Sequence, residues 1–501
     1  MAPVQALADS DPAARIPYAF ARTHGVLPFR SEGDAVVVLL RPDATIEGIA
    51  ELKRVLNRPL LTRAVEAETF ATELARAYNQ GGAALALREG LANEADLARL
   101  MQELPASEDL LDDTAQAPVI RMINALLLQA LRERASDLHF EPYEARAVVR
   151  FRVDGMLRDV VEPPRALHGA LVSRLKIMAG LDIAEKRLPQ DGRIALKLGD
   201  RQVDVRVSTL PTGAGERVVL RLLDQEAARL DLAALGMSDT TLEAIDRLIR
   251  QPHGILLVTG PTGSGKTTTL YAALSRLPRG ITNMMTVEDP IEYALDGVAQ
   301  TQVNARIDLT FSRALRSILR QDPDVIMIGE IRDVETAQIA VQASLTGHLV
   351  LATLHTNDAA SAITRLADMG VEPYLLASSL LGVLAQRLVR TLCTHCRKAS
   401  PPSDGERRLH DELGLPATTV AWQADGCERC NHSGFSGRTG VYELLEIDDT
   451  LRRLIHDGAG ELALRDAALR GGMQRLRSDG SRLIADGTTS LTELTRVTRD
   501  A

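Results

Sequence analysis

The sequence predicts an α/β protein of several domains, and three observations lead to that prediction. A short apolar stretch, residues 254–259, leads into a glycine-rich loop, and the loop leads into a helix-forming stretch. Between residues 147 and 223, apolar residues and arginines alternate in short runs, as they do in half-buried strands. Two Cys-x-x-Cys pairs lie closer to the C-terminus. The length of 501 residues favours about three domains.

The glycine-rich loop, residues 260–267, has the G-x-x-x-x-G-K-[ST] spacing of a phosphate-binding P-loop. Its glycines let successive backbone N–H groups surround phosphate oxygens, and the helix N-terminus adds positive potential. We expect Lys266 to reach the β- and γ-phosphates of a nucleoside triphosphate and Thr267 to hold Mg²⁺. A chance match on a glycine-rich turn is the alternative, but the strand and the helix argue against it. The predicted nucleotide-binding residues are Gly260, Pro261, Thr262, Gly263, Ser264, Gly265, Lys266, Thr267 and Thr268.

Later stretches supply carboxylates for a hydrolysis site. Residues 324–330 are predicted to form a buried strand that ends in Glu330, with Gly329 where a generic P-loop hydrolase has an aspartate. We therefore predict that Glu330 orients or deprotonates the attacking water. Glu288 and Asp289 follow another apolar stretch and are predicted to lie near Mg²⁺ with Glu330 and the P-loop threonine. A solvated turn is the alternative for this pair.

A third strand, residues 346–355, has a histidine near each end. His355 follows the strand directly and is predicted to sense the γ-phosphate, with His348 as a second candidate. A satisfied structural histidine is the alternative for both.

The four cysteines of the chain are predicted to bind one structural Zn²⁺. Disulfides are rare in a reducing compartment, and four thiolates form a closed tetrahedral site with no open position for catalysis. The gap between the pairs exceeds the usual zinc-ribbon spacing, so an inserted subdomain is expected there. His395 and His432 are candidate substitute ligands, and four unrelated thiols are the alternative. The predicted ligands are Cys393, Cys396, Cys427 and Cys430.

The composition and net charge of the chain limit the classes of protein to which it can belong. A content of 45% hydrophobic and 25% charged residues is typical of a globular protein with a sizeable core. The net charge of −9 argues against nucleic acid as the main partner. No basic start followed by an apolar core is visible, and the longest apolar stretch, residues 374–385, is too short to span a bilayer. We expect a cytoplasmic protein whose contact with a membrane, if any, goes through a surface or a partner.

Four segments follow one another along the chain. Residues 1–80 form a small unit, residues 81–114 a linker with an acidic run, residues 115–228 a second unit, and residues 229–501 the nucleotide domain with a zinc module at about 390–435. The expected elements of the first two units are a strand at 35–40, helices at 45–55, 67–78 and 119–131, and strands at 147–153, 193–197, 203–207 and 217–223. Turns are expected at 154–155 and 199–200.

The strands of the second unit carry cationic side chains. As a set beside a nucleotide domain they indicate contact with phosphate, for which the fixed fork of arginine is suited; a solvated sheet face is the alternative. These residues are Arg150, Arg152, Arg193, Arg206, Arg217 and Arg221.

In combination, these stretches resemble the secretion-ATPase superfamily, which powers type II secretion and type IV pilus assembly. Residues 260–267 are similar to its Walker A loop, 286–292 to its aspartate box, 324–333 to its Walker B region and 346–358 to its histidine box. The resemblance covers about residues 115–501 and is strongest to the general secretory pathway protein E family. The further stretches that carry it are 135–141, 150–155, 182–193 and 203–209.

The resemblance implies a RecA-like P-loop NTPase domain, preceded by a PAS-like α+β domain and a small N-terminal α/β domain. It also implies a homohexamer that hydrolyses ATP with Mg²⁺ to power pseudopilus assembly and protein export. ATP would lie between the second and third units, with Arg206 and Arg221 reaching its phosphates. The first unit would bind the cytoplasmic domain of the inner-membrane platform protein, the L protein of type II secretion. The polytopic platform protein is a second candidate partner.

Three other functions compete with this one. A pilus or competence-pilus assembly ATPase is the nearest, and the tetracysteine pairs disfavour a retraction ATPase. A nucleic-acid motor has a related fold, but the acidic charge and the 3% aromatic content argue against it. A nucleotide-binding scaffold without turnover is the third, and the intact Lys266, Thr267 and Glu330 argue against that.

Overall fold

The computed structural model of the chain describes residues 16, 18–32, 34–67, 69–70, 73–74, 113–198, 201–224, 231–416 and 418–498. The chain divides into two compact parts, an N-terminal part, Met1–Glu226, and a C-terminal part, Ala227–Ala501. Strands form sheets of three and six strands in the N-terminal part, and of seven and two strands in the C-terminal part. Within the described ranges, no helix is long and apolar enough to cross a membrane.

The first sheet has the order β1-β2-β3, with β1 antiparallel and β3 parallel to β2. The helix after β2 begins where the side chain of Thr45 accepts a hydrogen bond from the N–H of Gly48, a standard N-cap. The predicted strand 35–40 and helix 45–55 are confirmed, whereas most of the predicted helix 67–78 and of the linker 81–114 lies outside the described residues. The elements are α1 (Tyr18–His24), β1 (Val26–Glu32), β2 (Ala35–Leu40), α2 (Ile46–Leu56) and β3 (Leu60–Ala64).

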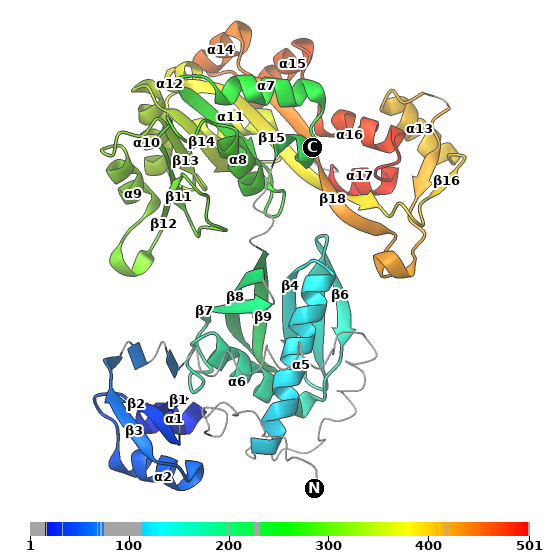
Figure 1. Cartoon of the computed structure of the whole chain (residues 1–501). Helices are drawn as coiled ribbons and strands as arrows, with labels where there is room; N and C mark the ends of the chain where they lie inside the picture. The colour runs from blue at the N-terminus through cyan, green and yellow to red at the C-terminus, as the bar shows by residue number, and fades with distance from the viewer. Residues whose placement is uncertain are drawn as a thin grey trace. The chain divides into compact units, whose positions relative to one another are not determined.

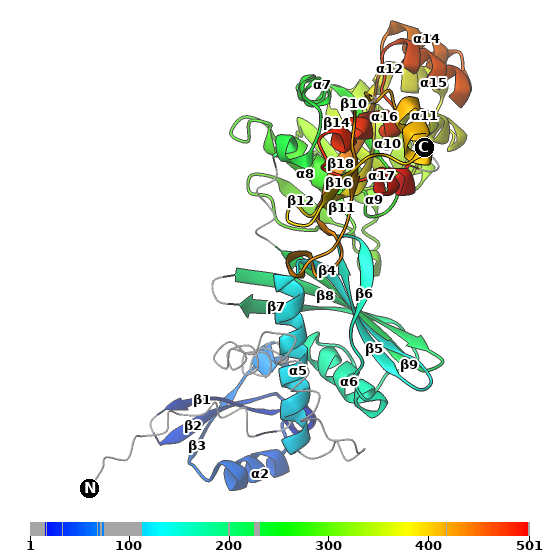
Figure 2. The same ribbon diagram turned by 90° about the vertical axis from the view of Figure 1, so that its right-hand side faces the viewer.

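The second sheet is antiparallel with the order β6-β5-β4-β9-β8-β7, and α5 and α6 cover one of its faces (Figure 2). The predicted strands are confirmed within longer ones; β4, β6 and α6 were not predicted, and the expected turn 199–200 lies outside the described residues. The elements are α5 (Asp113–Arg132), β4 (Ala135–Pro142), β5 (Ala147–Val153), β6 (Met156–Val161), α6 (His168–Met178), β7 (Gln190–Leu198), β8 (Arg201–Thr212) and β9 (Gly215–Asp224).

Arginines line up across this second sheet. The register pairs Arg221 with Asp137 on one side and with Arg206 on the other, and Arg206 in turn with Arg193. Residues that face each other across strands project to the same side, so these side chains share the face opposite α5 and α6. Asp137 is buried and accepts a hydrogen bond from Nε of Arg221 at 2.8 Å.

The seven-stranded sheet of the C-terminal part has the order β12-β11-β13-β14-β10-β15-β18, and its strands are parallel except for β18 (Figure 1). Its strands are β10 (Gly254–Thr259), β11 (Met284–Glu288), β12 (Ala299–Gln302), β13 (Val325–Ile328), β14 (Leu349–Leu354), β15 (Leu380–Leu392) and β18 (Phe435–Glu446). The helices next to these strands are α7 (Asp239–Ile249), α8 (Lys266–Ser275), α9 (Phe311–Ile318), α10 (Val334–Leu345), α11 (Ala359–Asp368) and α12 (Pro373–Ser379).

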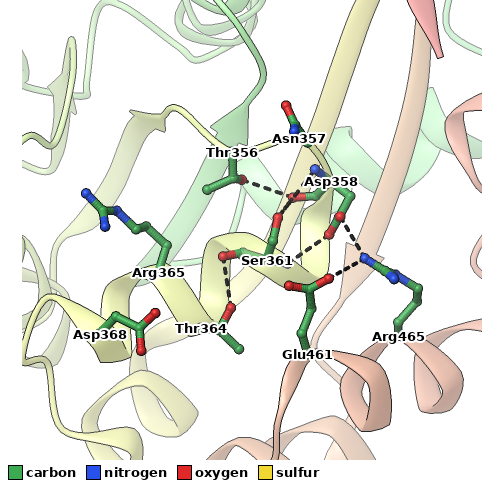
Figure 3. A pocket seen from close by; sticks show the side chains of 9 residues that line it. All are labelled: Thr356, Asn357, Asp358, Ser361, Thr364, Arg365, Asp368, Glu461 and Arg465. Atoms are coloured by element: carbon green, nitrogen blue, oxygen red, sulfur yellow. Dashed lines mark hydrogen bonds and ion pairs between the residues drawn. The ribbon is translucent and has the colours of Figure 1, made fainter. Parts of the chain in front are cut away.

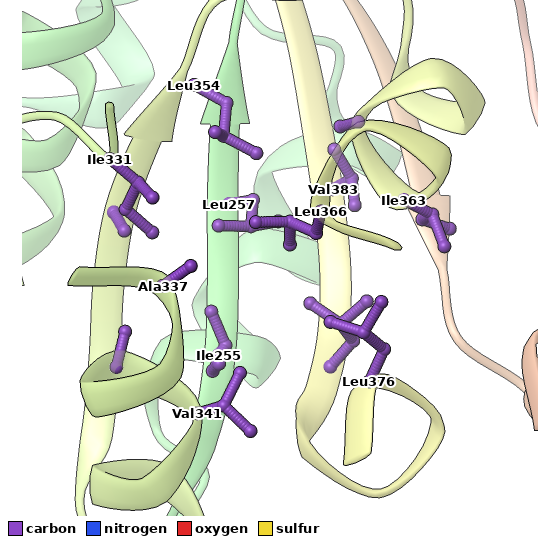
Figure 4. Close-up of a cluster of buried hydrophobic side chains, with 14 of the residues drawn as sticks. Ile255, Leu257, Ile331, Ala337, Val341, Leu354, Ile363, Leu366, Leu376 and Val383 are labelled. Atoms are coloured by element: carbon purple, nitrogen blue, oxygen red, sulfur yellow. The ribbon is translucent and has the colours of Figure 1, made fainter. Parts of the chain in front are cut away.

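Apolar side chains on both faces of this sheet form its core. One cluster joins β10, β13 and β14 to α9, α10 and α11. Figure 4 shows part of it, including Leu257 of β10, Val341 of α10 and Ile363 of α11. A second cluster joins the other face to α7 and α8 through residues such as Leu256, Leu270 and Tyr271. Every residue of β10 and β14 is buried, as expected for parallel strands covered on both faces. The sheet is therefore a rigid platform for the residues at its ends.

The tetracysteine pairs lie at the end of a two-stranded ribbon. β15 and β18 pair antiparallel, and the segment between them contains β16 (Lys398–Ser400), α13 (Asp404–Glu412) and β17 (Ala421–Gln423). The predicted inserted subdomain is thus present. The ribbon packs against α16 (Leu476–Ala485) and α17 (Leu491–Val497), while α14 (Asp449–His456) and α15 (Glu461–Arg470) follow β18.

A buried carboxylate fastens α17 to β15. Glu493 accepts hydrogen bonds from Arg390 and Arg496, at 2.8 Å from Nη2 of Arg390. Burial alone would raise the pKa of Glu493, but these two guanidinium groups outweigh it and hold the pKa near 2, below the usual 4.5. Because the folded-state pKa is depressed, Glu493 contributes stability above about pH 4.5 and loses it as the pH falls toward 2.

We predict that Glu493→Gln lowers the stability of this region by about 2 kcal/mol at neutral pH, since the two arginines lose their hydrogen bonds to a charged carboxylate. The single tryptophan, Trp422, lies against Gly487 just before α17, so its fluorescence reports local unfolding. The difference between variant and wild type should shrink as the pH falls from 4.5 toward 2. A difference that stays constant across this range would contradict the assignment.

Candidate functional site

The parallel strands of the large sheet bring four predicted stretches to one edge. Thr259, the last residue of β10, is in register with Leu354 on β14 and with Ala385 on β15. The carboxyl ends of β10 and β14 therefore lie side by side, whereas β15 continues past them to Leu392. Ligands of open parallel sheets bind outside such ends. The P-loop follows β10, Glu330 follows β13 and His355 follows β14.

The P-loop turns sharply out of β10 into α8. Gly260 has a φ of +149°, and a Cβ there would stand 2.6 Å from the backbone oxygen of Gln386. The helices α7, α9, α10 and α11 each have an N-cap side chain that accepts a hydrogen bond from an N–H of the first turn. The N-cap of α8 is Gly265, which has no side chain to do so. The first N–H groups of α8 are thus left for an anion. In the first turn, Thr267 and Thr268 are partly exposed, as binding of a metal–phosphate group requires.

Lys266 lies across the loop that it follows. Its Nζ donates to the carbonyl oxygens of Gly260 at 2.8 Å and Pro261 at 3.2 Å. Burial lowers the pKa of Lys266 to about 8; Glu330 raises it and Arg387 lowers it further. The ammonium group is therefore close to the edge carboxylate and held in an environment where a phosphate would stabilise its charge.

Glu330 is held by two neighbours at this edge. His355 Nε2 lies 2.9 Å from Glu330 Oε1, and Arg332 Nε donates to Oε2 at 2.8 Å. Burial and the nearby Lys266 cation lower the pKa of His355, so its imidazole is neutral at neutral pH and donates from Nε2. The side chain of Glu330 is 21% exposed, so water reaches the carboxylate.

Gly329 explains why this site lacks the aspartate of generic P-loop hydrolases. Its N–H donates to the carbonyl of Val287 at 2.8 Å, and a Cβ at this position would stand 3.2 Å from that oxygen and 3.3 Å from Cα of Glu288. The close approach of β11 therefore leaves little room for a side chain. The first carboxylate that can reach the edge from β13 is Glu330.

Glu288 does not reach the site that we predicted for it. Its side chain is buried, and it accepts hydrogen bonds from the hydroxyls of Tyr271 and Thr286 and from Nε2 of Gln300. Three donors occupy its lone pairs inside the sheet, so a role beside Mg²⁺ is not supported. Asp289, the next residue, is exposed by 44%, and its Oδ2 lies 3.8 Å from Nη1 of Arg332. The predicted pair thus divides into a buried structural carboxylate and an edge carboxylate.

The two histidines predicted to sense the γ-phosphate lie at opposite ends of β14. His348 precedes the strand, and its Nδ1 lies 2.8 Å from the carbonyl oxygen of Ala343. Six strand residues separate it from the P-loop edge, a length of about 20 Å. The assignment of His348 to this site is therefore corrected. His355 lies beside Glu330, and its role as a sensor of the γ-phosphate stays a prediction.

The loop after His355 is fixed by polar contacts that line a pocket of about 470 Å³ (Figure 3). Asp358 caps α11 by accepting from the N–H of Ser361, and it also accepts from Nη2 of Arg465, both at 2.8 Å. Glu443 on β18 accepts from the N–H of Ala359 at 2.9 Å, and burial raises its pKa. These carboxylates are committed to holding the loop.

The four cysteine sulfurs converge as predicted. Their ligand atoms lie within 4.8 Å of one another, and three of the separations are 3.8 or 3.9 Å. A tetrahedron with Zn–S bonds of about 2.3 Å requires separations of about 3.8 Å, whereas a disulfide is bonded at about 2.05 Å. The N–H groups of Gly426 and Gly434 point at sulfurs at 3.3 Å. The residues present fit a four-thiolate metal site.

The predicted substitute ligands are not part of this cluster, which contains only cysteines among the described residues. The ring nitrogens of His395 lie 2.8 and 3.0 Å from Nη1 of Arg429. The guanidinium group of Arg397 stacks over Trp422 at 4.6 Å and donates to the carbonyl of Gly487. The module is thereby attached to the segment that leads into α17.

Several residues that hold the site escaped the sequence analysis. Arg332, Tyr271 and the pair Gln386–Arg387 all contact it or its supports. The pair was the one with a visible signal, because two polar residues interrupt an otherwise apolar stretch from residue 380 to 389. Such an interruption inside a buried strand indicates a polar partner.

Comparisons with known proteins agree with this architecture. Residues 112–496 match the family described as type II/IV secretion system protein, and residues 15–78 match an N-terminal domain family of GSPII protein E. The chain is 60% identical to type II secretion system protein HxcR of Pseudomonas aeruginosa over 97% of its length and 99% of that protein. It is 51% identical to type II secretion system ATPase E of Vibrio cholerae, covering 97% of both.

Solved structures support the fold class. The ATPase DotB of Legionella pneumophila is 21% identical, with a TM-score of 0.56 over 76% of this chain and 95% of that one. The pilus retraction motor PilT with bound ADP is 25% identical, with a TM-score of 0.50 over 75% of this chain and 96% of that one. The predicted class is confirmed: a RecA-like P-loop domain with a tetracysteine module inserted, preceded by a PAS-like α+β domain and a small N-terminal α/β domain.

The depressed pKa of Lys266 predicts a pH dependence. Because neutral lysine offers no charge to phosphate, kcat/KM for ATP should fall above about pH 8, up to tenfold per pH unit. The kcat value should fall less, since bound phosphates keep the ammonium group protonated. Steady-state phosphate release between about pH 7 and 9.5 measures both. A kcat/KM that stays level over this range would contradict the role of Lys266.

The sulfur geometry predicts one Zn²⁺ per chain. Removing the metal with a chelator should unfold the module around residues 393–430 and shift the fluorescence of Trp422, because the site folds with its metal. Nucleotide binding should persist, since no cysteine contacts the P-loop edge. Atomic absorption and a fluorescent ADP titration check the two parts. A chelated protein with an intact ribbon that no longer binds nucleotide would contradict this separation.

Proposed function

The chain belongs to the type II/IV secretion system protein family, and on that premise we propose that it is a cytoplasmic ATP hydrolase that powers type II protein secretion. The observation that supports this most is the sheet edge where an uncapped P-loop helix, Lys266 and Glu330 meet. Near-full-length relatives that are named as type II secretion proteins support the choice of machine.

The residues divide the work of hydrolysis among them. The P-loop N–H groups and Lys266 bind the phosphates of ATP and neutralise charge that develops at the γ-phosphoryl group. Glu330 orients the attacking water and accepts its proton, while His355 and Arg332 hold the carboxylate at the edge. Neutral His355, next to this carboxylate, also senses whether a γ-phosphate is present.

Metal ions fit two places. Mg²⁺ would be held by the hydroxyl of Thr267 and by the phosphates, with Asp289 and Glu330 nearby, and it would supply charge at the β- and γ-oxygens. Zn²⁺ would be held by Cys393, Cys396, Cys427 and Cys430, and it would have a structural role because four thiolates complete its shell.

The assembly and the partners that we propose rest on the family resemblance. The active form would be a homohexamer, with Arg206 and Arg221 of the PAS-like domain reaching the phosphates. Arg221 would then have to release or share its partner Asp137, so nucleotide binding and movement of this domain would be coupled. The small N-terminal domain would bind the cytoplasmic domain of the L protein, which would hold the motor peripherally at the inner membrane and leave it to drive pseudopilus assembly.

We predict that Glu330→Gln leaves ATP binding within about threefold and lowers kcat by at least about 100-fold, because glutamine keeps the shape of the side chain and one acceptor oxygen but accepts no proton. Phosphate release and a fluorescent ATP titration measure the two effects. Glu446→Gln, on an exposed carboxylate at the far end of β18, is the matched control and should change neither. Unchanged phosphate release in Glu330→Gln would contradict the assignment of the base.

The choice of machine is tested by complementation in the source bacterium, with wild type and Lys266→Ala in a strain that lacks the gene. Exported enzymes in the medium and pili on the surface are both scored. We expect the variant to trap the exported enzymes in the periplasm and to leave the pili intact. Loss of pili with normal export would keep the motor but replace its machine with a pilus assembly system.

A further inference from the structure

A buried glutamine contacts the back of the P-loop. Gln386 lies on β15, one residue after the position that is in register with the end of β10. It is 2% exposed and follows Val383, Leu384 and Ala385, which are fully buried. An uncharged amide in such surroundings is costly unless both its donor and its acceptor are satisfied.

The donor and the acceptor of this amide both make hydrogen bonds, one to the P-loop and one to the start of α8. Nε2 of Gln386 donates to the carbonyl of Ser264 at 2.6 Å, and Oε1 accepts from the hydroxyl of Thr269 at 2.8 Å. The carbonyl can only accept, so the amide has one orientation that satisfies both contacts. One side chain thus joins β15 to the P-loop and to the first turn of α8.

The P-loop needs such a contact for a physical reason. A loop that directs its N–H groups toward phosphate turns its carbonyl groups the other way, where each requires a donor. At Ser264 that donor is Gln386. The fit is close, because a Cβ on Gly265 would stand 3.2 Å from Nε2 of Gln386. The loop is shaped against this amide as well as for the nucleotide.

We propose that Gln386 is a positioning residue of the nucleotide site, which keeps the N–H groups of the P-loop directed at the phosphates. The inference rests on the proposed ATPase function. Gln386 touches no phosphate in this scheme and acts through Ser264 and Thr269. Its neighbour Arg387 points to the other loop and donates to the carbonyl of Asn357 at 2.8 Å, so β15 also supports the loop after His355.

Two variants test the proposal in the full-length protein. Gln386→Glu keeps the shape and the acceptor but loses the donor to Ser264, and Gln386→Met keeps the length but loses both contacts. We expect each to raise KM for ATP and the Kd for ADP about tenfold, because a buried carbonyl loses its donor. Val389→Ala, at a buried apolar position three residues further along β15, is the matched control. It should lower Tm but leave KM unchanged.

Comparing the change in KM with the change in kcat separates a positioning role from a loss of structure. Partial unfolding lowers the active fraction and therefore kcat, without changing KM.

Thr269→Val provides a second, milder test, since it removes only the hydroxyl that donates to Oε1 of Gln386. Combined with Gln386→Met, it should add less than twofold to KM, because both residues act in one contact. If Gln386→Met does not fold, Thr269→Val alone should raise KM two- to threefold.

The outcomes are distinct. A raised KM in both Gln386 variants with a normal control supports the proposal. An unchanged KM, or a fall in kcat that only follows the folded fraction, overturns the role of Gln386. If the wild-type protein still hydrolyses ATP, the proposed function is unaffected by that result. A wild-type protein that binds no ADP and releases no phosphate would instead overturn the proposed function itself.

Discussion

The register of the parallel strands is the constraint on which the rest of the site depends. Val287, Ile328 and Ala352 are aligned across β11, β13 and β14, and Thr259 is aligned with Leu354 on β14. Because a shift by one residue would turn every side chain to the other face, the buried core on both faces fixes this alignment. This alignment brings the P-loop, Glu330 and His355 to the same end of the sheet.

β15 extends this constraint beyond the nucleotide edge. It is the longest strand of the large sheet, and it supports the P-loop through Gln386 and binds α17 through Arg390. It ends at Leu392, next to Cys393. A carboxylate from β18, Glu443, supports the loop after His355 from the other side of the ribbon. One continuous pair of strands therefore joins the P-loop end of the large sheet to the tetracysteine module.

The sequence predicted those parts of the site that local patterns determine. The P-loop and the cysteine pairs are encoded in short motifs with fixed spacing, and their geometry follows from that spacing. Glu288 and His348 were misplaced because motif membership does not reveal which end of a strand a residue occupies, or whether its carboxylate is turned inward. Gln386 was missed for a related reason, since its partners Ser264 and Thr269 lie over a hundred residues earlier in the chain. The polar pair inside an apolar stretch indicates that a polar partner exists, but no local pattern shows which distant residues it contacts.

The central claim is that this edge positions Glu330 to activate water against a phosphate held by Lys266 and the P-loop. The measurement that tests it most directly is a crystal structure with Mg²⁺ and a non-hydrolysable ATP analogue. The account predicts that Lys266 leaves the carbonyls of Gly260 and Pro261 for the phosphates. It also predicts that a water in line with the γ-phosphate lies within about 3 Å of Glu330. A water held by another carboxylate, with Glu330 turned away, would contradict the account.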